Sequence, residues 1–302
     1  MSHIYIFSPS SAVRDKAAFK RGVKRLQAQG HQVEIDADAL SSNMRFAGDD
    51  STRLNAITRA AASGADIAMI SRGGYGLTRL LTQLPYKAIA KAIDKGTQFV
   101  GLSDFTAFQL AVYAKTHRIT WQGPALGEDF GSAHEPDEIM QACFDDLCLE
   151  QGEGTGWRFP ANELAKPVKV NNAVLWGGNL AVLTSMLGTP FFPAVKGGVL
   201  FLEDVGEHPY KVERMLTQLY NAGVLQQQKA IVFGQFTAYK LVAHDKGFKL
   251  KTVTDRLRSQ LKIPVLTGLP FGHVPTKVLL PIGAKVDLAT EGRDAFLVWG
   301  HI

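Results

Sequence analysis

Apolar and polar positions alternate with two different periods along the first 125 residues of the chain. Short continuous apolar runs, such as those at 67–70 and 99–102, are typical of strands that are buried on both faces of a parallel sheet. Between such runs, apolar residues recur at helical spacing, and two of these stretches end at Gly30 and Gly64. The alternation predicts repeated βα units. We expect strands at 4–7, 31–35, 67–70, 99–102 and 119–121, and helices at 14–29, 51–63 and 105–116.

The pattern weakens between residues 131 and 169, where Gly152, Gly154 and Gly156 stand among polar residues. Such a composition is typical of a loop that joins two domains. Beyond it we expect strands at 199–202 and 230–233, helices at 210–222 and 253–261, and short antiparallel strands at 277–280, 285–288 and 296–299. The pattern as a whole predicts an α/β protein of two domains. These are an N-terminal parallel-sheet βα domain at 1–130, a linker region at 131–168, and a C-terminal mixed α/β domain with short antiparallel strands at 169–302.

The composition is that of an ordinary globular protein, since 46% of the 302 residues are hydrophobic and 20% are charged. No run of about 18 uncharged apolar residues occurs, so no membrane-spanning segment is predicted. The first apolar stretch follows no positive residue and ends at Pro9, which makes it too short for a secretory signal. We therefore expect a cytoplasmic protein.

The charge gives little reason to expect a nucleic-acid partner. The 33 Lys and Arg residues and 28 Asp and Glu residues leave a formal net charge of only +5. The densest basic stretch, from Arg14 to Arg25, surrounds a predicted amphipathic helix, which fits a solvated helix face. The His, Cys, Asp and Glu residues do not cluster at the spacing of metal ligands, so we predict no metal site.

Ser103 lies between a predicted buried strand and a predicted helix, in the sequence Gly101-Leu102-Ser103-Asp104-Phe105. This is the position of a nucleophile elbow, where a sharp turn exposes the serine hydroxyl and the next N–H group can face an oxyanion. Phe105 stands where the elbow motif has its second glycine. A helix N-cap explains a serine at this position equally well.

A glycine-rich turn, Arg72-Gly73-Gly74-Tyr75-Gly76, directly follows the predicted strand at 67–70. Glycines let backbone N–H groups approach a substrate closely, so the turn is a candidate oxyanion donor or anion nest. It matches neither the P-loop nor the dinucleotide-binding motif. A tight strand-to-helix turn without a binding role is the alternative.

Two residues of the second half complete a possible catalytic set with Ser103. Glu203 stands at the exit of a predicted buried strand, and His273 lies in a rigid non-helical loop between strands. The order serine, acid, histidine is that of the α/β-hydrolases, one of several orders that build a catalytic triad.

At these residues the sequence resembles the LD-carboxypeptidases, also called muramoyl-tetrapeptide carboxypeptidases, of serine peptidase family S66. The matching segments fall in the family's order over essentially the whole chain. They are Arg72-Gly73-Gly74-Tyr75-Gly76, Gly101-Leu102-Ser103-Asp104-Phe105-Thr106-Ala107, Leu175-Trp176-Gly177-Gly178-Asn179-Leu180, the segment from Phe201 to Tyr210, and Phe271-Gly272-His273.

The resemblance implies a homodimeric cytosolic enzyme of cell-wall recycling that releases the terminal D-alanine of murein tetrapeptides and needs no metal or cofactor. It implies Ser103 as nucleophile, His273 as general base and Glu203 as the acid that orients it, with the active site in the cleft between the domains. The oxyanion hole is then formed by backbone N–H groups of Gly74 or Gly73 together with Asp104.

Three further residues are candidates for binding the substrate. A carboxypeptidase must recognise a free terminal carboxylate, and Arg72 is the candidate cation by its placement. Tyr75 and Trp176 could form the wall of the pocket, and a core position is the alternative for both.

Two other functions remain open. A self-immunity peptidase that cleaves peptide-nucleotide antibiotics would share the fold and the chemistry. A non-catalytic muropeptide-binding protein would use the same cleft, but serine, acid and histidine at all three family positions argue against it. The sequence does not distinguish meso-diaminopimelate from lysine as the third residue of the substrate.

Overall fold

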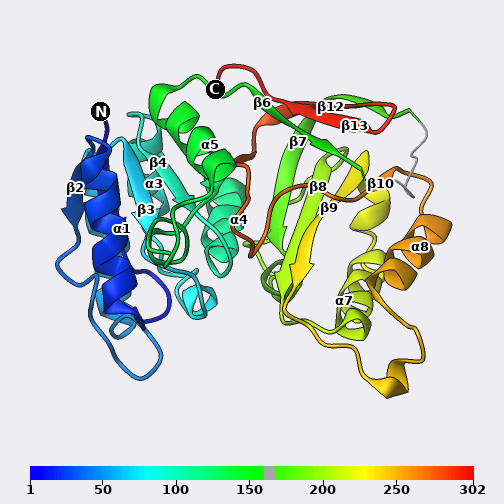
Figure 1. Cartoon of the computed structure of the whole chain (residues 1–302), viewed down its shortest axis with the longest axis horizontal. Helices are drawn as coiled ribbons and strands as arrows, with labels where there is room; N and C mark the ends of the chain where they lie inside the picture. Colours follow the sequence, from blue (N-terminus) through cyan, green and yellow to red (C-terminus); the bar gives the residue numbers. More distant parts are fainter. Residues whose placement is uncertain (160–166) are drawn as a thin grey trace. The chain divides into compact units, whose positions relative to one another are not determined.

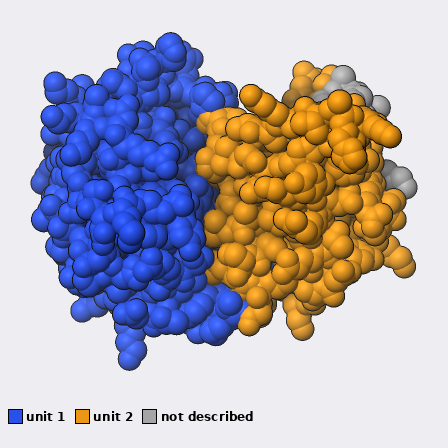
Figure 2. Space-filling view, turned by 90° about the horizontal axis from the view of Figure 1, so that it is seen from below, with its two compact units in different colours: residues 1–152, 189–193, 275–283 blue, residues 153–188, 194–274, 284–302 orange. Residues whose placement is uncertain are grey.

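The computed structural model describes residues 1–159 and 167–302, and the chain forms two compact units (Figure 1). Figure 2 shows the atoms of unit 1 in blue and those of unit 2 in orange. Unit 1 consists of Met1–Gly152, Thr189–Pro193 and Pro275–Gly283, and unit 2 consists of Glu153–Gly188, Ala194–Val274 and Ala284–Ile302. Each unit is therefore assembled from three stretches of the chain.

Unit 1 is built on a six-stranded sheet in the order β11-β5-β4-β3-β1-β2. Strands β1 to β5 pair in parallel, and β11 joins the edge antiparallel to β5. The strands are β1 (His3–Phe7), β2 (Gln32–Ile35), β3 (Ile67–Ile70), β4 (Gln98–Gly101), β5 (Thr120–Gln122) and β11 (Leu280–Ile282). The helices are α1 (Lys16–Ala28), α2 (Asp50–Ala62), α3 (Tyr86–Ile93), α4 (Phe105–Thr116) and α5 (Glu138–Leu149), with the single turns η1 (Leu77–Arg79) and η2 (Leu126–Phe130).

Unit 2 is built on a mixed seven-stranded sheet in the order β10-β9-β8-β7-β12-β13-β6. Strands β7 to β10 pair in parallel, and β12, β13 and β6 extend the sheet antiparallel. The strands are β6 (Gly154–Arg158), β7 (Lys169–Asn179), β8 (Val199–Val205), β9 (Ala230–Thr237), β10 (Val265–Leu266), β12 (Lys285–Glu291) and β13 (Asp294–Val298). The helices are α6 (Leu180–Ser185), α7 (Pro209–Asn221) and α8 (Leu250–Gln260), with the single turns η3 (Leu225–Gln227) and η4 (Ala243–Asp245). The predicted α/β fold with a parallel and a mixed sheet is confirmed.

The glycine-rich segment that we expected to be a loop forms the edge strand β6, which pairs with β13. Trp157 is buried there, and its indole Nε1 donates a hydrogen bond of 3.0 Å to the carbonyl oxygen of Thr267. Glycines in an edge strand weaken it without preventing pairing, and one large apolar side chain fixes the strand against the rest of the unit. The expected boundary residues 131–168 also contain helix α5.

Strand β7 was not among the elements that the apolar pattern predicted. Its last residues include Gly177 and Gly178, both with positive φ angles (136° and 125°), which is unusual for a strand. A Cβ atom at Gly177 would overlap the carbonyl oxygen of Phe201 on the neighbouring strand β8. The glycine therefore permits a close approach of two strand backbones, and it removes the apolar side chain that would have marked the strand in the sequence.

Aromatic packing under the carboxyl end of β4 fixes the start of helix α4. The ring of Phe105, the first residue of α4, stacks on Phe108 at 4.6 Å between centroids and meets Phe7 of β1 edge-on at 6.2 Å. All three side chains are fully buried. Burial of one such ring stabilises the fold by about 2–3 kcal/mol. The turn that contains Ser103 is thus anchored on its helical side.

Among the helices of residues 1–159 and 167–302, none has the length and apolar character that crossing a bilayer requires.

Candidate active site

Three loops of unit 1 meet at the carboxyl ends of β1, β3 and β4. The strand order reverses between β1 and β3, and ligands of open α/β sheets bind at such a switch point. The loop after β1 contains Ser11, whose N–H donates to the carbonyl oxygen of Gly73 in the loop after β3. Ser103 follows β4. The loop after β1 therefore contacts the loop after β3, and Gly73 of that second loop lies against the side chain of Ser103.

Ser103 has a left-handed backbone conformation, with φ at +66°. Helix α4 begins at Phe105, and its N-cap residue is Asp104, whose side chain forms no capping hydrogen bond. The interpretation of Ser103 as a helix N-cap is therefore wrong. A non-glycine residue in this conformation costs free energy, and such strain is typical of the serine in a nucleophile elbow.

Gly73 lies directly against the side chain of Ser103. A Cβ atom at Gly73 would come within 2.6 Å of the Ser103 Cβ and within 2.8 Å of its Oγ, so only glycine fits without displacement. The next residue, Gly74, has a φ of +111°, and a Cβ atom there would overlap the side chain of Ser11. Both glycines are thus required by close contacts, as expected of a turn that brings its backbone up to a reacting group.

The backbone N–H groups of Gly73, Gly74 and Asp104 donate no hydrogen bond within residues 1–159 and 167–302. Oxyanion holes are commonly formed by backbone N–H groups of this kind, which have no other partner and lie near the serine hydroxyl.

The carboxyl group of Asp104 ties the three loops together. It is buried, accepts a hydrogen bond from the Ser10 hydroxyl, and accepts the Leu77 N–H at 2.9 Å. Burial raises the pKa of Asp104, although both hydrogen bonds act in the opposite direction. Because Ser10 follows β1 and Leu77 follows the glycine turn, this one side chain connects both loops to the residue next to Ser103.

Glu203 and His273 form a close pair within unit 2. The Nδ1 atom of His273 lies 2.7 Å from Oε2 of Glu203. Glu203 is fully buried at the end of β8, whereas the side chain of His273 is 16% exposed. Gly272 has a φ of +145°, and a Cβ atom there would lie 3.3 Å from Oε2 of Glu203. When Glu203 is ionised, Nδ1 must carry the hydrogen, which leaves Nε2 as a proton acceptor.

Two residues of this site had no role in the sequence analysis, although both lie in the matched motifs. The Nδ2 atom of Asn179 lies 3.2 Å from Oε1 of Glu203 and 3.0 Å from Oδ1 of Asp204. Asp204 also accepts the N–H groups of Ala181 at 2.9 Å and of Val205 at 2.8 Å. Burial, and then the charge of Glu203, raise the pKa of Asp204 to about 6. The position of Asn179 directly after two glycines is the sequence signal that could have identified it.

The three candidate substrate-binding residues have different surroundings. The guanidinium of Arg72 is partly buried, and its Nη1 donates to the carbonyl oxygen of Ala12 at 3.2 Å. Tyr75 is 45% exposed. Trp176 is fully buried, and its Nε1 lies 3.1 Å from Oε1 of Gln228. This environment favours the core interpretation for Trp176 and leaves Arg72 and Tyr75 as the accessible candidates.

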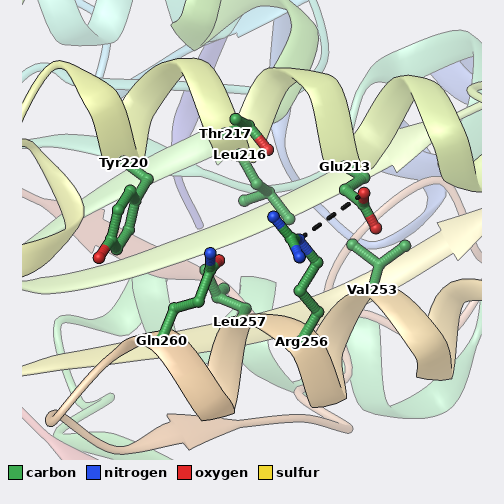
Figure 3. Close-up of a pocket in the computed structure, with 8 residues that line it drawn as sticks. All are labelled: Glu213, Leu216, Thr217, Tyr220, Val253, Arg256, Leu257 and Gln260. Atoms are coloured by element: carbon green, nitrogen blue, oxygen red, sulfur yellow. Dashed lines mark ion pairs between the residues drawn. The ribbon is translucent and has the colours of Figure 1, made fainter.

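Two hollows of unit 2 contain none of the residues named above. The larger one is an open hollow of about 510 Å³ beside the first residues of β7, and Lys169, Lys229 and Pro264 are among its lining residues. A shallow groove between α7 and α8 is bridged by Arg256 and Glu213, whose Nε and Oε1 atoms are 3.8 Å apart (Figure 3). Its cavity volume of about 10 Å³ has room for at most one water molecule, so the groove is a seam between packed helices. Within residues 1–159 and 167–302, no three His, Cys, Asp or Glu side chains are grouped so that they could hold a metal ion.

Both halves of the chain match models of one protein family. The model of the LD-carboxypeptidase N-terminal domain matches residues 4–123, and that of the LD-carboxypeptidase C-terminal domain matches residues 172–288. The chain is 30% identical over 277 residues to the probable murein peptide carboxypeptidase of Bacillus subtilis, which covers 91% of this chain and 85% of that protein.

Two further proteins are similar over nearly the whole chain. The microcin C7 self-immunity protein MccF of Escherichia coli is 27% identical over 316 residues, which covers 95% of this chain and 90% of that protein. The crystal structure of muramoyltetrapeptide carboxypeptidase from Oxalobacter formigenes superimposes with a TM-score of 0.89 at 37% identity, covering 99% of this chain and 98% of that one.

Proposed function

Since the chain belongs to the LD-carboxypeptidase family, we propose that it is a serine carboxypeptidase that releases the terminal D-alanine of murein tetrapeptides. The observation that carries the proposal is the pairing of His273 with the buried Glu203, together with a strained Ser103 beside free backbone N–H groups. These are the parts that acyl transfer needs: a nucleophile, an oriented base and an oxyanion hole.

In the first step of the proposed reaction, Oγ of Ser103 attacks the carbonyl carbon of the third residue of the tetrapeptide. The Nε2 atom of His273 takes the hydroxyl proton as the new C–O bond forms. Glu203 stabilises the resulting imidazolium by accepting its Nδ1–H at 2.7 Å. The negative charge on the carbonyl oxygen is held by N–H groups of Gly73 or Gly74 and of Asp104, and the loss of one such donor costs on the order of 3 kcal/mol.

In the second step the tetrahedral intermediate collapses and the peptide C–N bond breaks. The imidazolium of His273 gives its proton to the departing amine, so D-alanine leaves neutral at that nitrogen and the tripeptide remains as an ester on Ser103. A water molecule then attacks the ester carbonyl and His273 accepts its proton. The C–Oγ bond breaks, the imidazolium returns the proton to Oγ of Ser103, and the tripeptide leaves with a new carboxylate.

We also propose that the enzyme acts in the cytoplasm on recycled wall fragments, as a homodimer and without a metal or cofactor. The resemblance of the motifs and the name of the Bacillus subtilis relative support a murein substrate. Arg72 is proposed to bind the terminal carboxylate, with Tyr75 as a wall of the pocket.

The test is mass spectrometry of a murein tetrapeptide after incubation with the purified protein, with and without EDTA, beside Ser103→Ala. We expect the loss of one alanine that is insensitive to EDTA and abolished in Ser103→Ala. Ser185→Ala, a change of an exposed serine in unit 2, is the matched control and should cleave normally. Cleavage by Ser103→Ala would exclude Ser103 as the nucleophile.

A second candidate substrate follows from the similarity to the microcin C7 self-immunity protein. The same assay is therefore run with a microcin-type peptide-nucleotide. Cleavage of this compound with an intact tetrapeptide would replace the murein proposal by the self-immunity function. If both compounds survive and the tetrapeptide still binds, a non-catalytic muropeptide-binding protein becomes the better description.

A further inference from the structure

Helix α2 contains a fully buried arginine, Arg53. It shares the buried face of the helix with Ala56, Ile57 and Ala60, where an apolar side chain is the usual choice. Its Nε atom has no hydrogen-bond partner in the described part of the chain. Burying a cation and an unsatisfied donor costs free energy, and an apolar residue would fill the position at a lower cost. Helix packing alone therefore does not account for an arginine at this position.

The guanidinium of Arg53 joins two loops of the candidate site. Its Nη1 atom donates to the carbonyl oxygens of Pro9 at 3.2 Å and of Gly76 at 2.9 Å. Pro9 lies in the loop after β1, and Gly76 ends the glycine turn after β3. Gly76 has a φ of +140°, and a Cβ atom there would lie 2.6 Å from Nη1 of Arg53. The glycine therefore lets the turn approach the guanidinium closely.

The peptide group between Gly76 and Leu77 is held from both sides. Its carbonyl oxygen accepts the hydrogen bond from Arg53, and its N–H donates to Oδ2 of Asp104 at 2.9 Å. The C=O and N–H of a trans peptide group point in opposite directions. This peptide group therefore lies between a buried guanidinium and a buried carboxyl group.

The loop after β1 is held in the same way. Pro9 accepts a hydrogen bond from Arg53, and the hydroxyl of the adjacent residue Ser10 donates to Asp104. Burial raises the pKa of Asp104, and the positive charge of Arg53 is among the effects that oppose this rise. Two buried groups of opposite charge thus hold neighbouring residues of both loops. We call this pair of side chains the Arg53–Asp104 clamp.

Two further contacts fix the guanidinium of Arg53. Its Nη2 atom lies 2.6 Å from Oδ1 of Asp50, and its Cζ atom lies 4.8 Å from the centre of the Phe46 ring. An ion pair and a stacked aromatic ring together restrict the planar group to one orientation. The donor that reaches the two loops therefore has a defined position.

The clamp acts on both parts of the proposed oxyanion hole. Asp104 itself carries one of the backbone N–H groups, and the turn that ends at Gly76 carries the other, at Gly73 or Gly74. We propose that Arg53 and the side chain of Asp104 are positioning residues that fix the spacing of these two N–H groups. The inference rests on the proposed function and adds two side chains that need not touch the substrate. Oxyanion donors act through preorganisation, so a small displacement lowers the rate without weakening the binding of the substrate.

The first measurement is kcat and KM of Arg53→Met, which removes the charge and the donors but keeps a long side chain. We expect kcat on the murein tetrapeptide to fall by about 10²-fold, the effect of losing one oxyanion donor, with KM changed by less than about threefold. The dissociation constant of the tetrapeptide, measured by calorimetry in the Ser103→Ala background, should stay close to the value without the Arg53 substitution. Arg53→Lys keeps the charge and loses the planar fork, so its kcat should lie between those of the native protein and Arg53→Met.

A double-mutant cycle tests whether the two side chains act together. Asp104→Asn removes the negative charge and leaves the backbone N–H in place, and we expect it to lower kcat by about tenfold. The double variant Arg53→Met and Asp104→Asn should be about as slow as Arg53→Met alone, because both side chains hold the same two loops. Two losses that multiply would show that the side chains act independently, which would overturn the clamp.

Arg59→Met is the matched control, because Arg59 is an arginine of the same helix that pairs with Asp36 instead of the glycine turn. It should lower the unfolding temperature and leave kcat within about twofold of the native value. Thermal unfolding of each variant identifies those that are folded in the assay. If Arg53→Met does not fold, Arg53→Lys and Asp104→Asn decide the question. Native kcat in the folded clamp variants, or a loss no larger than that in Arg59→Met, would contradict the proposal.

Labelling with a fluorophosphonate separates this inference from the proposed function, since this probe contains no peptide. Oγ of Ser103 bonds to the phosphorus, fluoride leaves, and His273 takes the hydroxyl proton. The labelling rate should fall by about 10²-fold in Arg53→Met, because the same N–H groups hold the phosphoryl oxygen.

The two assays together give distinct outcomes. If the native protein leaves the tetrapeptide intact but its labelling depends on Arg53, the proposed function fails and the clamp stands. If the tetrapeptide is cleaved, and Arg53→Met keeps the native rates of cleavage and labelling, the proposed function stands and the clamp fails. A native protein that neither cleaves the tetrapeptide nor becomes labelled at Ser103 would overturn both.

Discussion

Ser103 keeps a backbone conformation that a serine adopts only at a cost. A left-handed φ of +66° costs a non-glycine residue about 1–2 kcal/mol relative to the right-handed region. The buried neighbours of the turn, Phe105 and Asp104, provide the contacts that hold it there. Ser103 is one of seven non-glycine residues with a positive φ in the described chain, and a strained conformation of this kind is what the proposed nucleophile elbow requires.

Replacing Glu203 by Gln should separate its electrostatic role from its shape. The amide cannot stabilise an imidazolium, and its NH₂ group can donate to Nδ1 of His273 and so favour the wrong tautomer. We expect kcat to fall by about 10³- to 10⁴-fold, as for the loss of the acid in other triads, with a circular dichroism spectrum like that of the native protein. Glu213→Gln, which removes a carboxylate from the α7–α8 seam, is the control and should retain full turnover. Unchanged turnover in Glu203→Gln would remove Glu203 from the triad.

The raised pKa of Asp204 predicts how the free energy of unfolding depends on pH. The pKa of an unperturbed aspartate is 3.8, and burial raises that of Asp204 to about 6 in the folded protein. The folded state therefore binds more protons than the unfolded state between these values, and the free energy of unfolding falls as the pH rises through this window. This difference corresponds to about 3 kcal/mol, lost between about pH 4 and pH 6.

The variant Asp204→Asn cannot titrate and should lack this loss. Urea unfolding from pH 4 to pH 8 gives the comparison, in which the native protein should lose about 3 kcal/mol relative to the variant as the pH rises. The diagnostic quantity is the difference between the two proteins in how the free energy of unfolding changes with pH. The absolute stability is not diagnostic, because asparagine also removes an acceptor from the N–H group of Ala181. Asp287→Asn, at an exposed position of the same unit, controls for the loss of one carboxylate. Parallel pH profiles for Asp204→Asn and the native protein would contradict the prediction.

At the scale of elements, the sequence predicted best where an apolar run and its flanking turn are contiguous. Strands β1, β3 and β4 and helices α1 and α4 follow from such runs, and the loops after β3 and β4 contain the predicted site residues of unit 1. The role of Asn179 depends on register, since β7 pairs with β8 so that Asn179 lies opposite Glu203. Register between strands that are about 24 residues apart is a tertiary property, so no local pattern could predict this contact.

The glycine turn after β3 offers a test at this scale. Gly73→Ala introduces a methyl group within 2.8 Å of Oγ of Ser103, so the hydroxyl or the turn must move. We expect kcat/KM to fall by at least about 10²-fold, the effect of losing one oxyanion donor or misplacing the nucleophile. Gly156→Ala is the control, because the nearest atom to an added Cβ in β6 is 3.4 Å away. Native kcat/KM in Gly73→Ala would show that the contact between Gly73 and Ser103 has no part in the reaction.

At the scale of the whole molecule, the chain enters unit 1 for the last time at Pro275, two residues after His273. Residues Pro275–Gly283 belong to unit 1, where β11 pairs with β5. Thr276 donates its hydroxyl hydrogen bond to Asp137 at 2.6 Å, and the Nζ atom of Lys277 lies 2.6 Å from Oδ1 of Asp129. The segment next to the proposed base is therefore held by three different attachments to the first sheet and its surrounding helices.

The buried pair of Lys277 and Asp129 should be the most sensitive of these attachments. Both side chains are less than 5% exposed, with values of 3% and 4%, and burial raises the pKa of Asp129. Lys277→Met leaves a buried carboxylate without its cation, which typically costs about 3–5 kcal/mol. The double variant Asp129→Asn and Lys277→Met buries no charge, and its amide oxygen can still accept the Ala125 N–H. We therefore expect urea unfolding to show a large loss in Lys277→Met and recovery of most of that loss in the double variant.

The coupling between the two substitutions is the decisive quantity, because each variant alone also changes packing. If the pair stabilises unit 1 mainly by neutralising a buried charge, the double variant is more stable than Lys277→Met by several kcal/mol. Additive losses would instead mean that Lys277 acts through the packing of its long aliphatic chain. Activity measured on the same variants extends the argument to His273. A double variant that regains stability but not turnover would show that the anchoring of residues 275–283 also positions the base.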